Sequence, residues 1–192
     1  MRVLELQHTL AQVLARVRIE VPEGTALHRT ATAELDMVQA YASDSRTFLA
    51  GDDPVNALAA CAYGFGWLHF GMTFGLLECP GPGACPFTSP YECLPGACRE
   101  KLSEKTARYQ RLLTTALSSV SCAPDPSTPA YRFAQKVLFI AGLYAGHGSR
   151  LLRGGNREEA LACFSYGHGW LDAGVQAGLF IIHANREIFT VD

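Results

Sequence analysis

The stretch SYGHGWLDAG, residues 165–174, decides the fold, because a close copy of it, AYGFGWLHFG, occurs at residues 62–71. A shift of 103 positions aligns residues 1–77 with residues 104–180 without a gap, and the last part of this alignment holds 11 identities over 24 positions. Self-similarity at a fixed offset indicates a tandem duplication. The expected organisation is a first repeat at 1–77, a Cys-, Pro- and Gly-rich linker at 78–103, a second repeat at 104–183 and a tail at 184–192.

Each repeat is predicted to form three helices. In the first repeat, apolar residues recur at helical spacing over 2–18, and the breaker Pro22-Glu23-Gly24 separates this segment from helices expected over 26–50 and 54–77. No stretch alternates convincingly with a period of two, so we expect an all-α fold in which two three-helix units form a pseudo-two-fold bundle. Side chains typical of helix N-caps precede the second and third helices of each repeat, at Thr25, Asp53, Thr128 and Asn156.

Glycines inside the third helix of each repeat need an explanation, because each interior glycine costs roughly 1 kcal/mol relative to alanine. Small residues recur at spacings of three and four, and the GxxxG pairs Gly71/Gly75 and Gly174/Gly178 suggest close approach of helix backbones. We expect the two third helices to pack on each other, or each on its own second helix, through these faces. The alternative is that the glycines line a ligand pocket.

The segment ending NREEALACFSYGHGWLDAGVQAGLF and its earlier counterpart resemble the short archaeal proteins grouped as domain of unknown function 357. Tyr166, Gly169, Trp170 and the run Leu171-Asp172-Ala173-Gly174 keep the pattern of that family. The resemblance covers about 150 residues as two copies. It implies a small helical bundle and an archaeal source, and it implies no activity.

Composition excludes several classes of function. The formal net charge of −2 gives no basic surface for nucleic acid or anionic lipid. The apolar runs are shorter than the roughly 20 residues that a membrane-spanning helix needs. The start, MRVLELQHTL, has no apolar core typical of a signal peptide, so we expect a cytoplasmic protein.

Aspartate and histidine exchange places between the repeats. The first repeat has Asp44 and His69, and at the corresponding positions the second repeat has His147 and Asp172. These residues could meet across the pseudo-two-fold axis and form a site, or they could be the result of drift after duplication. Residues 168 and 172 are spaced i,i+4, so their side chains can pair on one helix face. The candidate ligand-binding residues are Asp44, His69, His147, Tyr166, His168 and Asp172.

The linker ECPGPGACPFTSPYECLPGACRE carries four cysteines: Cys79, Cys85, Cys93 and Cys98. Four thiolates could hold zinc tetrahedrally or an iron–sulfur cluster, although the spacings differ from those of common zinc knuckles. Disulfides and unmodified thiols are the alternatives.

No phosphate-binding glycine loop, nucleophile elbow or HExxH motif occurs in the chain. The leading interpretation is therefore a non-enzymatic helical module that associates with itself or with a protein partner. A metal or cluster protein based on the linker cysteines is the second hypothesis. A small-molecule binder or enzyme with a His/Asp site between the repeats is the third.

Overall fold

The computed structural model describes residues 2–80 and 94–190. Within these residues the chain forms six α-helices, as the sequence predicts, and the all-α class is confirmed. The first repeat contains α1 (Arg2–Leu14), α2 (Ala26–Ala50) and α3 (Pro54–Phe74), and the second contains α4 (Arg99–Ser118), α5 (Pro129–Arg153) and α6 (Arg157–Gln176). Short strands and 3-10 turns complete the described part: β1 (Arg18–Ile19), β2 (Leu77–Glu78), β3 (Val120–Cys122), β4 (Phe180–Ile182), η1 (Gly96–Cys98) and η2 (Arg186–Ile188).

The predicted N-caps are formed. The side chains of Thr25, Asp53, Thr128 and Asn156 each accept a hydrogen bond from the backbone N–H three residues later. These bonds satisfy amide groups that have no partner inside the helix, and proline in the first turn fixes the backbone angle at the start of α3 and of α5.

The expected helices over 2–18 and 54–77 are shorter than predicted, and short strand pairs follow them. Helix α1 ends at Leu14 and α3 at Phe74, after which β1 and β2 pair antiparallel; β3 and β4 pair in the same way in the second repeat. Gly75 ends α3, and Gly178 occupies the corresponding position after α6; their φ angles of 81° and 73° are left-handed. The GxxxG interpretation is therefore wrong at these two residues, because they turn the chain instead of packing two helices together.

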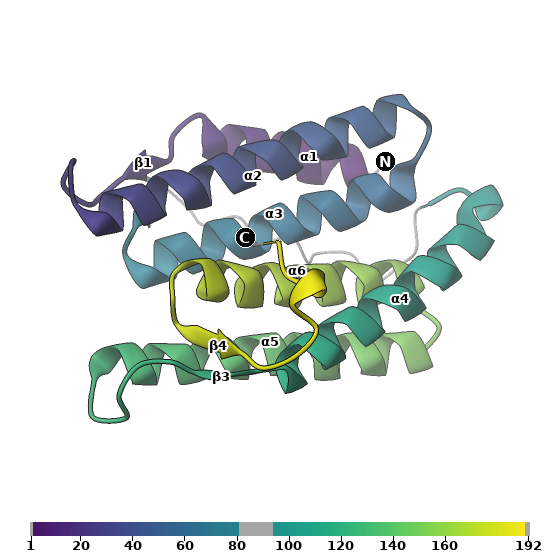
Figure 1. The fold of residues 1–192 in the computed structure, drawn as a ribbon. Helices are drawn as coiled ribbons and strands as arrows, with labels where there is room; N and C mark the ends of the chain where they lie inside the picture. Colours follow the sequence, from purple (N-terminus) through teal and green to yellow (C-terminus); the bar gives the residue numbers. More distant parts are fainter. Residues whose placement is uncertain (1, 81–93, 191–192) are drawn as a thin grey trace.

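The two repeats stack with α3 and α6 side by side in the middle of the molecule, between α2 on one side and α5 on the other (Figure 1). Both central helices are buried along most of their length. Helix α3 is hydrophobic on all sides, which is typical of a helix buried in a protein core, whereas α6 also buries polar side chains.

The third helices approach each other through glycines outside the predicted stripe. A Cβ atom added at Gly66 would lie 2.4 Å from the backbone oxygen of Tyr166, and one added at Gly169 would lie 2.4 Å from that of Tyr63. In contrast, Gly64 faces Tyr41 and Leu10, and Gly167 faces the equivalent residues of its own repeat. Both expected kinds of packing therefore occur, each on a different face of the same helix.

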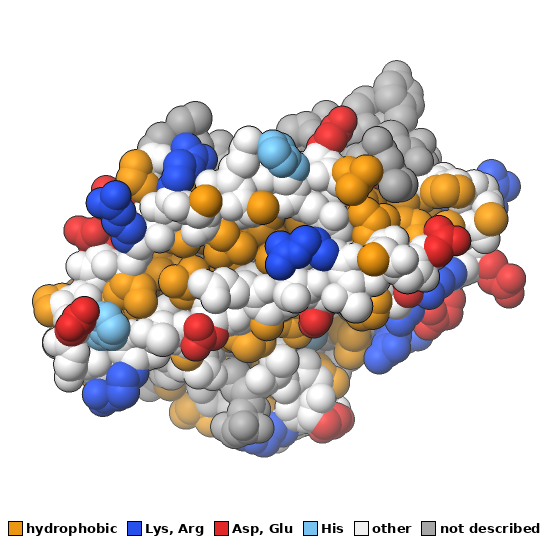
Figure 2. Space-filling model, turned by 90° about the horizontal axis from the view of Figure 1, so that it is seen from above, with side chains coloured by type: hydrophobic (Ala, Val, Ile, Leu, Met, Phe, Trp, Pro, Cys, Tyr) orange, Lys and Arg blue, Asp and Glu red, His pale blue; other side chains and the backbone are white. Residues whose placement is uncertain are grey.

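The face formed by α1 and α2 carries charged side chains of both signs around a band of hydrophobic ones (Figure 2). Among residues 2–80 and 94–190, no helix combines the length and the apolar character required to cross a bilayer.

Candidate functional site

Two tyrosines reach across the crossing of α3 and α6. The Tyr63 hydroxyl of α3 donates a hydrogen bond to the Asp172 carboxylate of α6. At the equivalent positions, the Tyr166 hydroxyl of α6 lies 2.9 Å from Nδ1 of His69 on α3. The same inter-repeat contact is thus made twice, once with a carboxylate and once with an imidazole.

A buried polar cluster surrounds Asp172. Its Oδ2 also accepts a hydrogen bond of 2.6 Å from the Thr190 hydroxyl, which lies 2.5 Å from the Tyr63 hydroxyl. Nε2 of His168, one turn earlier on α6, is 3.7 Å from Oδ1 of Asp172. Both side chains are almost completely buried, and within residues 2–80 and 94–190 neither Oδ1 of Asp172 nor Nε2 of His168 has a hydrogen-bond partner. Burying a polar atom without a hydrogen bond costs folding free energy, so the burial of these two atoms requires an explanation.

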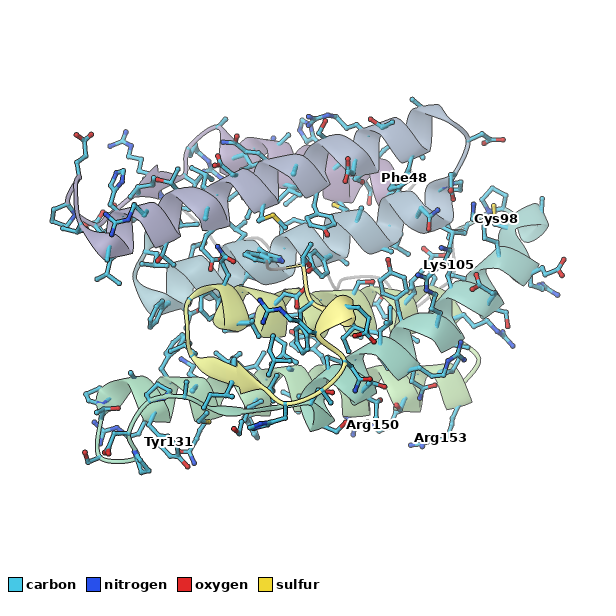
Figure 3. The ribbon with its side chains drawn as sticks, in the orientation of Figure 1. Phe48, Cys98, Lys105, Tyr131, Arg150 and Arg153 are labelled. Carbon is cyan, nitrogen blue, oxygen red and sulfur yellow. The ribbon has the colours of Figure 1, made fainter. Side chains whose placement is uncertain are left out.

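The cluster lies at a pocket of about 360 Å³. This volume is in the range of sites for small ligands. The pocket lies between elements of both repeats, and Figure 3 labels Phe48 on α2 and Lys105 on α4, two of the helices that enclose it. The lining residues are Tyr41, Asp44, Phe48, Asn56, Ala59, Ala60 and Tyr63 from the first repeat, and Lys105, Arg108, Tyr109, Leu112, His168, Asp172, Ile188 and Thr190 from the second repeat and the tail.

The pocket tyrosines remain protonated at neutral pH. Burial raises the pKa of Tyr63 well above its ordinary value, and the charge of Asp172 raises it further. Burial is also the main reason why the pKa values of Tyr41 and Tyr109 are raised. All three residues therefore present neutral hydroxyls that can donate or accept hydrogen bonds.

The structure brings together three of the six candidate residues, because Asp44, His168 and Asp172 line the same pocket. His69 and Tyr166 form the equivalent pair on the other side of the crossing. His147 is exposed on α5, where its Nδ1 lies 3.4 Å from an Arg150 nitrogen.

Sequence reasoning missed several residues of the pocket. Tyr41 and Tyr63 carried a usable signal, because each is identical to its counterpart in the second repeat. No signal in the sequence pointed to Lys105 and Arg108. Both lie on α4 of the second repeat, and they line the pocket only because α4 packs beside α2 and α3 of the first repeat. Thr190 lies in the tail, outside the duplicated region.

The linker cysteines are described only in part. Cys79 and Cys98 are half-buried and form no disulfide with another described cysteine, whereas Cys85 and Cys93 lie outside the described residues. Among residues 2–80 and 94–190, no three His, Cys, Asp or Glu side chains are grouped so that they could hold a metal ion. Zinc or an iron–sulfur cluster on the four linker cysteines stays a prediction.

Comparison with protein families gives the same repeat twice. The family described as Protein of unknown function (DUF357) matches residues 7–77 and again residues 108–180. The chain belongs to the DUF357 family. The two matches confirm the predicted tandem copies, and in this DUF357 protein the two copies meet at α3 and α6. No curated protein and no solved structure matches the chain.

Proposed function

We propose that this DUF357 protein binds a small organic molecule in the pocket between its repeats. The observation that carries the proposal is that Oδ1 of Asp172 and Nε2 of His168, which lie 3.7 Å apart, are buried at a pocket of about 360 Å³ and accept or donate no hydrogen bond among the described residues. A ligand with a polar group would satisfy atoms that the protein leaves without hydrogen bonds. This proposal replaces the non-enzymatic module as the leading interpretation, because it explains a specific cluster of side chains.

The test is a thermal-shift screen of small polar molecules, followed by titration calorimetry of those that stabilise the protein. Ligands that bind only the folded state raise its stability by mass action. We expect one ligand per chain, and we expect the variant Ala60→Leu, which places a larger side chain in the pocket, to lose binding. Ala40→Leu makes the same change at an exposed position of α2 outside the pocket and serves as the control. Equal binding by Ala60→Leu and the original protein would contradict the proposal.

A second candidate function, docking of a protein partner, is favoured by the surface of α5. Phe139 and Leu143 are 69% and 51% exposed, and a Cβ atom added at Gly142 or Gly146 would meet no atom within 4 Å. In α2 the positions of Phe139 and Leu143 hold Asp36 and Ala40, so the apolar surface is specific to the second repeat.

The basic charge of α5 favours a partner with acidic residues. Helix α5 has no acidic residue and carries four basic ones: Arg132, Lys136, Arg150 and Arg153. A second copy of α5 would place like charges opposite each other, whereas an amphipathic helix with acidic flanks would be complementary. We infer that such a helix from a partner docks here, its backbone close to Gly142 and Gly146.

A synthetic amphipathic helix with leucine and alanine on one face and glutamate on its flanks tests this docking by fluorescence anisotropy. We expect it to bind the protein and to lose affinity for the double variant Phe139→Asp, Leu143→Ala, which copies the first repeat. Equal binding of a peptide with lysine in place of glutamate would contradict the charge complementarity, and binding unaffected by the double variant would exclude this face.

A further inference from the structure

The exchange of aspartate and histidine between the repeats places both aspartates at the same pocket. Asp44 lies on α2 of the first repeat and Asp172 on α6 of the second, and both line the same pocket. Their counterparts in the duplication are His147 and His69. Because α2 of the first repeat and α6 of the second both line this pocket, the two carboxylates lie at one pocket. The histidines lie at the corresponding positions of α5 and α3. Random divergence of the two repeats would not be expected to place both carboxylates at one pocket.

The carboxylates, together with the tyrosines, form surroundings suited to a cationic group. Asp172 is completely buried and its Oδ1 has no hydrogen-bond partner in the described part of the chain, while the side chain of Asp44 is exposed. The rings of Tyr41 and Tyr63 pack with centroids 4.3 Å apart, and Tyr109 lines the same pocket. Carboxylates and aromatic ring faces both attract ammonium groups.

Two cations on α4 line the same pocket. Lys105 and Arg108 are spaced i,i+3, so their side chains leave the same face of the helix. Among the residues that the structure describes, neither has a hydrogen bond or an ion pair, although Asp44 and Asp172 line the pocket with them. In α1 the equivalent positions hold Arg2 and Glu5, so the first repeat does not have this pair of cations.

Charges of opposite sign are thus held apart around one pocket. Among the described residues, the carboxylates of Asp44 and Asp172 form no ion pair with Lys105 or Arg108, although all four side chains line one space of about 360 Å³. Such a lining is complementary to a molecule that carries both charges. A ligand with only a cation would bring no group to Lys105 and Arg108, and one with only an anion would bring no group to Asp44 or to Oδ1 of Asp172.

We propose that the ligand is a small zwitterion of the amino-acid class. Its ammonium group binds at Asp172 and Asp44 among the tyrosines, and its carboxylate binds at Lys105 and Arg108, where the arginine guanidinium can pair with both oxygens. The inference rests on the ligand-binding function proposed above and specifies the chemistry of that ligand.

The experiment uses the proteinogenic L-amino acids as probes, each at millimolar concentration, in thermal-shift assays and calorimetry with the full chain. The tightest binder is then compared with its decarboxylated amine and with its deaminated acid. We expect the amino acid to bind at least about tenfold more tightly than either of these two analogues, since each loses one charged contact.

Two variants test which side chains bind the ammonium group of the ligand and which bind its carboxylate. Asp44→Asn, at an exposed position, should lower affinity for the amino acid about tenfold and leave affinity for the deaminated acid unchanged. Lys105→Ala with Arg108→Ala should do the reverse, lowering affinity for the amino acid but not for the amine. His147→Asn, at the position equivalent to Asp44, is the matched control and should change neither.

The outcomes separate this inference from the proposed function. An amine or an acid that binds as tightly as the amino acid overturns the zwitterion and leaves a pocket for a single charge. If no amino acid binds but other polar molecules do so in a manner sensitive to Ala60→Leu, the ligand class is wrong and the pocket function stands. If no probe of either screen binds, both fail.

Discussion

Gly66 and Gly169 allow α3 and α6 to touch at backbone distance. An added Cβ at either position would lie 2.4 Å from a backbone oxygen, which cannot move aside as the end of a side chain can. We therefore predict that Gly66→Ala lowers the free energy of unfolding by about 1–3 kcal/mol or more, as measured by urea denaturation.

The control for this substitution is Gly142→Ala, also inside a helix but with nothing within 4 Å of the new Cβ. There the gain in helix propensity should stabilise the protein by roughly 0.5–1 kcal/mol. Loss of stability in both variants would show that the crossing is not the cause.

Glu34 on α2 is completely buried, and neither of its carboxyl oxygens has a hydrogen-bond partner among the residues that the structure describes. Burial raises its pKa from 4.5 to about 9, so the folded protein holds a proton that the unfolded chain releases. The free energy of unfolding should therefore fall as pH rises between these two values, with a limiting slope of about 1.4 kcal/mol per pH unit.

The second repeat supplies the variant that tests this pH dependence, because Val137 occupies the position of Glu34. Glu34→Val should flatten the decline in stability with pH, as measured by urea denaturation across that range. Asp36→Asn, at an exposed position of the same helix, should leave the decline as it is. A slope unchanged in Glu34→Val would mean that another group causes it.

At the scale of elements, Asp53 connects a helix start to the other repeat. Its carboxylate caps α3 at the N–H of Asn56 and lies 2.7 Å from Nζ of Lys101 on α4. Burial raises the pKa of Asp53, but the hydrogen bonds from Lys101 and Asn56 outweigh burial and lower it overall. Its contribution to stability is therefore present above the unfolded value of 3.8 and is lost as pH falls through the lower folded pKa.

We predict that Asp53→Ala costs about 1 kcal/mol of stability at neutral pH, and less at about pH 3, in urea denaturation. Asp53→Asn copies the cap of the second repeat, Asn156, and should keep most of the stability, because a partly exposed ion pair contributes about 0–1 kcal/mol. Equal losses in the two variants would assign the effect to the ion pair.

The elements most faithfully predicted from sequence are those with strong local signals. Caps at Asp53 and Asn156 and the 103-residue offset were enough to place the helices and the repeats. The two-residue strand β1 has too little sequence to show alternation, so the helix predicted over 2–18 extends into its first residue, Arg18. Gly75 was misread because a positive φ and a close helix approach both select glycine.

The site was predictable only where its residues stand out within one repeat. Asp44 and Asp172 were found because they differ from their histidine counterparts, but their meeting depends on which face of α3 packs on α6. Gly66 lies on the face of α3 that packs on α6, whereas Gly64 lies on the face that packs on α2. The spacing of the glycines in the sequence does not distinguish these two faces. Lys105 and Thr190 could be placed only by the tertiary structure.

At the scale of the whole molecule, the pocket exists only when both repeats are assembled. Tyr63 and Asp44 come from the first repeat, and Asp172 and Lys105 come from the second. Covalent fusion of the repeats makes it possible for equivalent positions to diverge, which identical subunits of a dimer cannot do. The duplicated chain can therefore hold a carboxylate, Asp172, at one crossing contact and an imidazole, His69, at the other.

The same interdependence predicts that the repeats unfold together. Phe70 of α3 contacts Trp170 of α6 and Phe133 of α5, with ring centroids 5.9 Å and 5.7 Å apart, so aromatic side chains of both repeats form one core. Trp67 and Trp170 are the two tryptophans of the chain, one in each repeat. Trp67→Phe and Trp170→Phe therefore each leave a fluorescent reporter in one repeat. In urea, the fluorescence transition of each variant should coincide with its loss of helix by circular dichroism, as a two-state transition requires. If one tryptophan became exposed before the helices of the other repeat melted, the repeats would be separate folding units. In that case a pocket built from both repeats could be lost while one repeat remained folded.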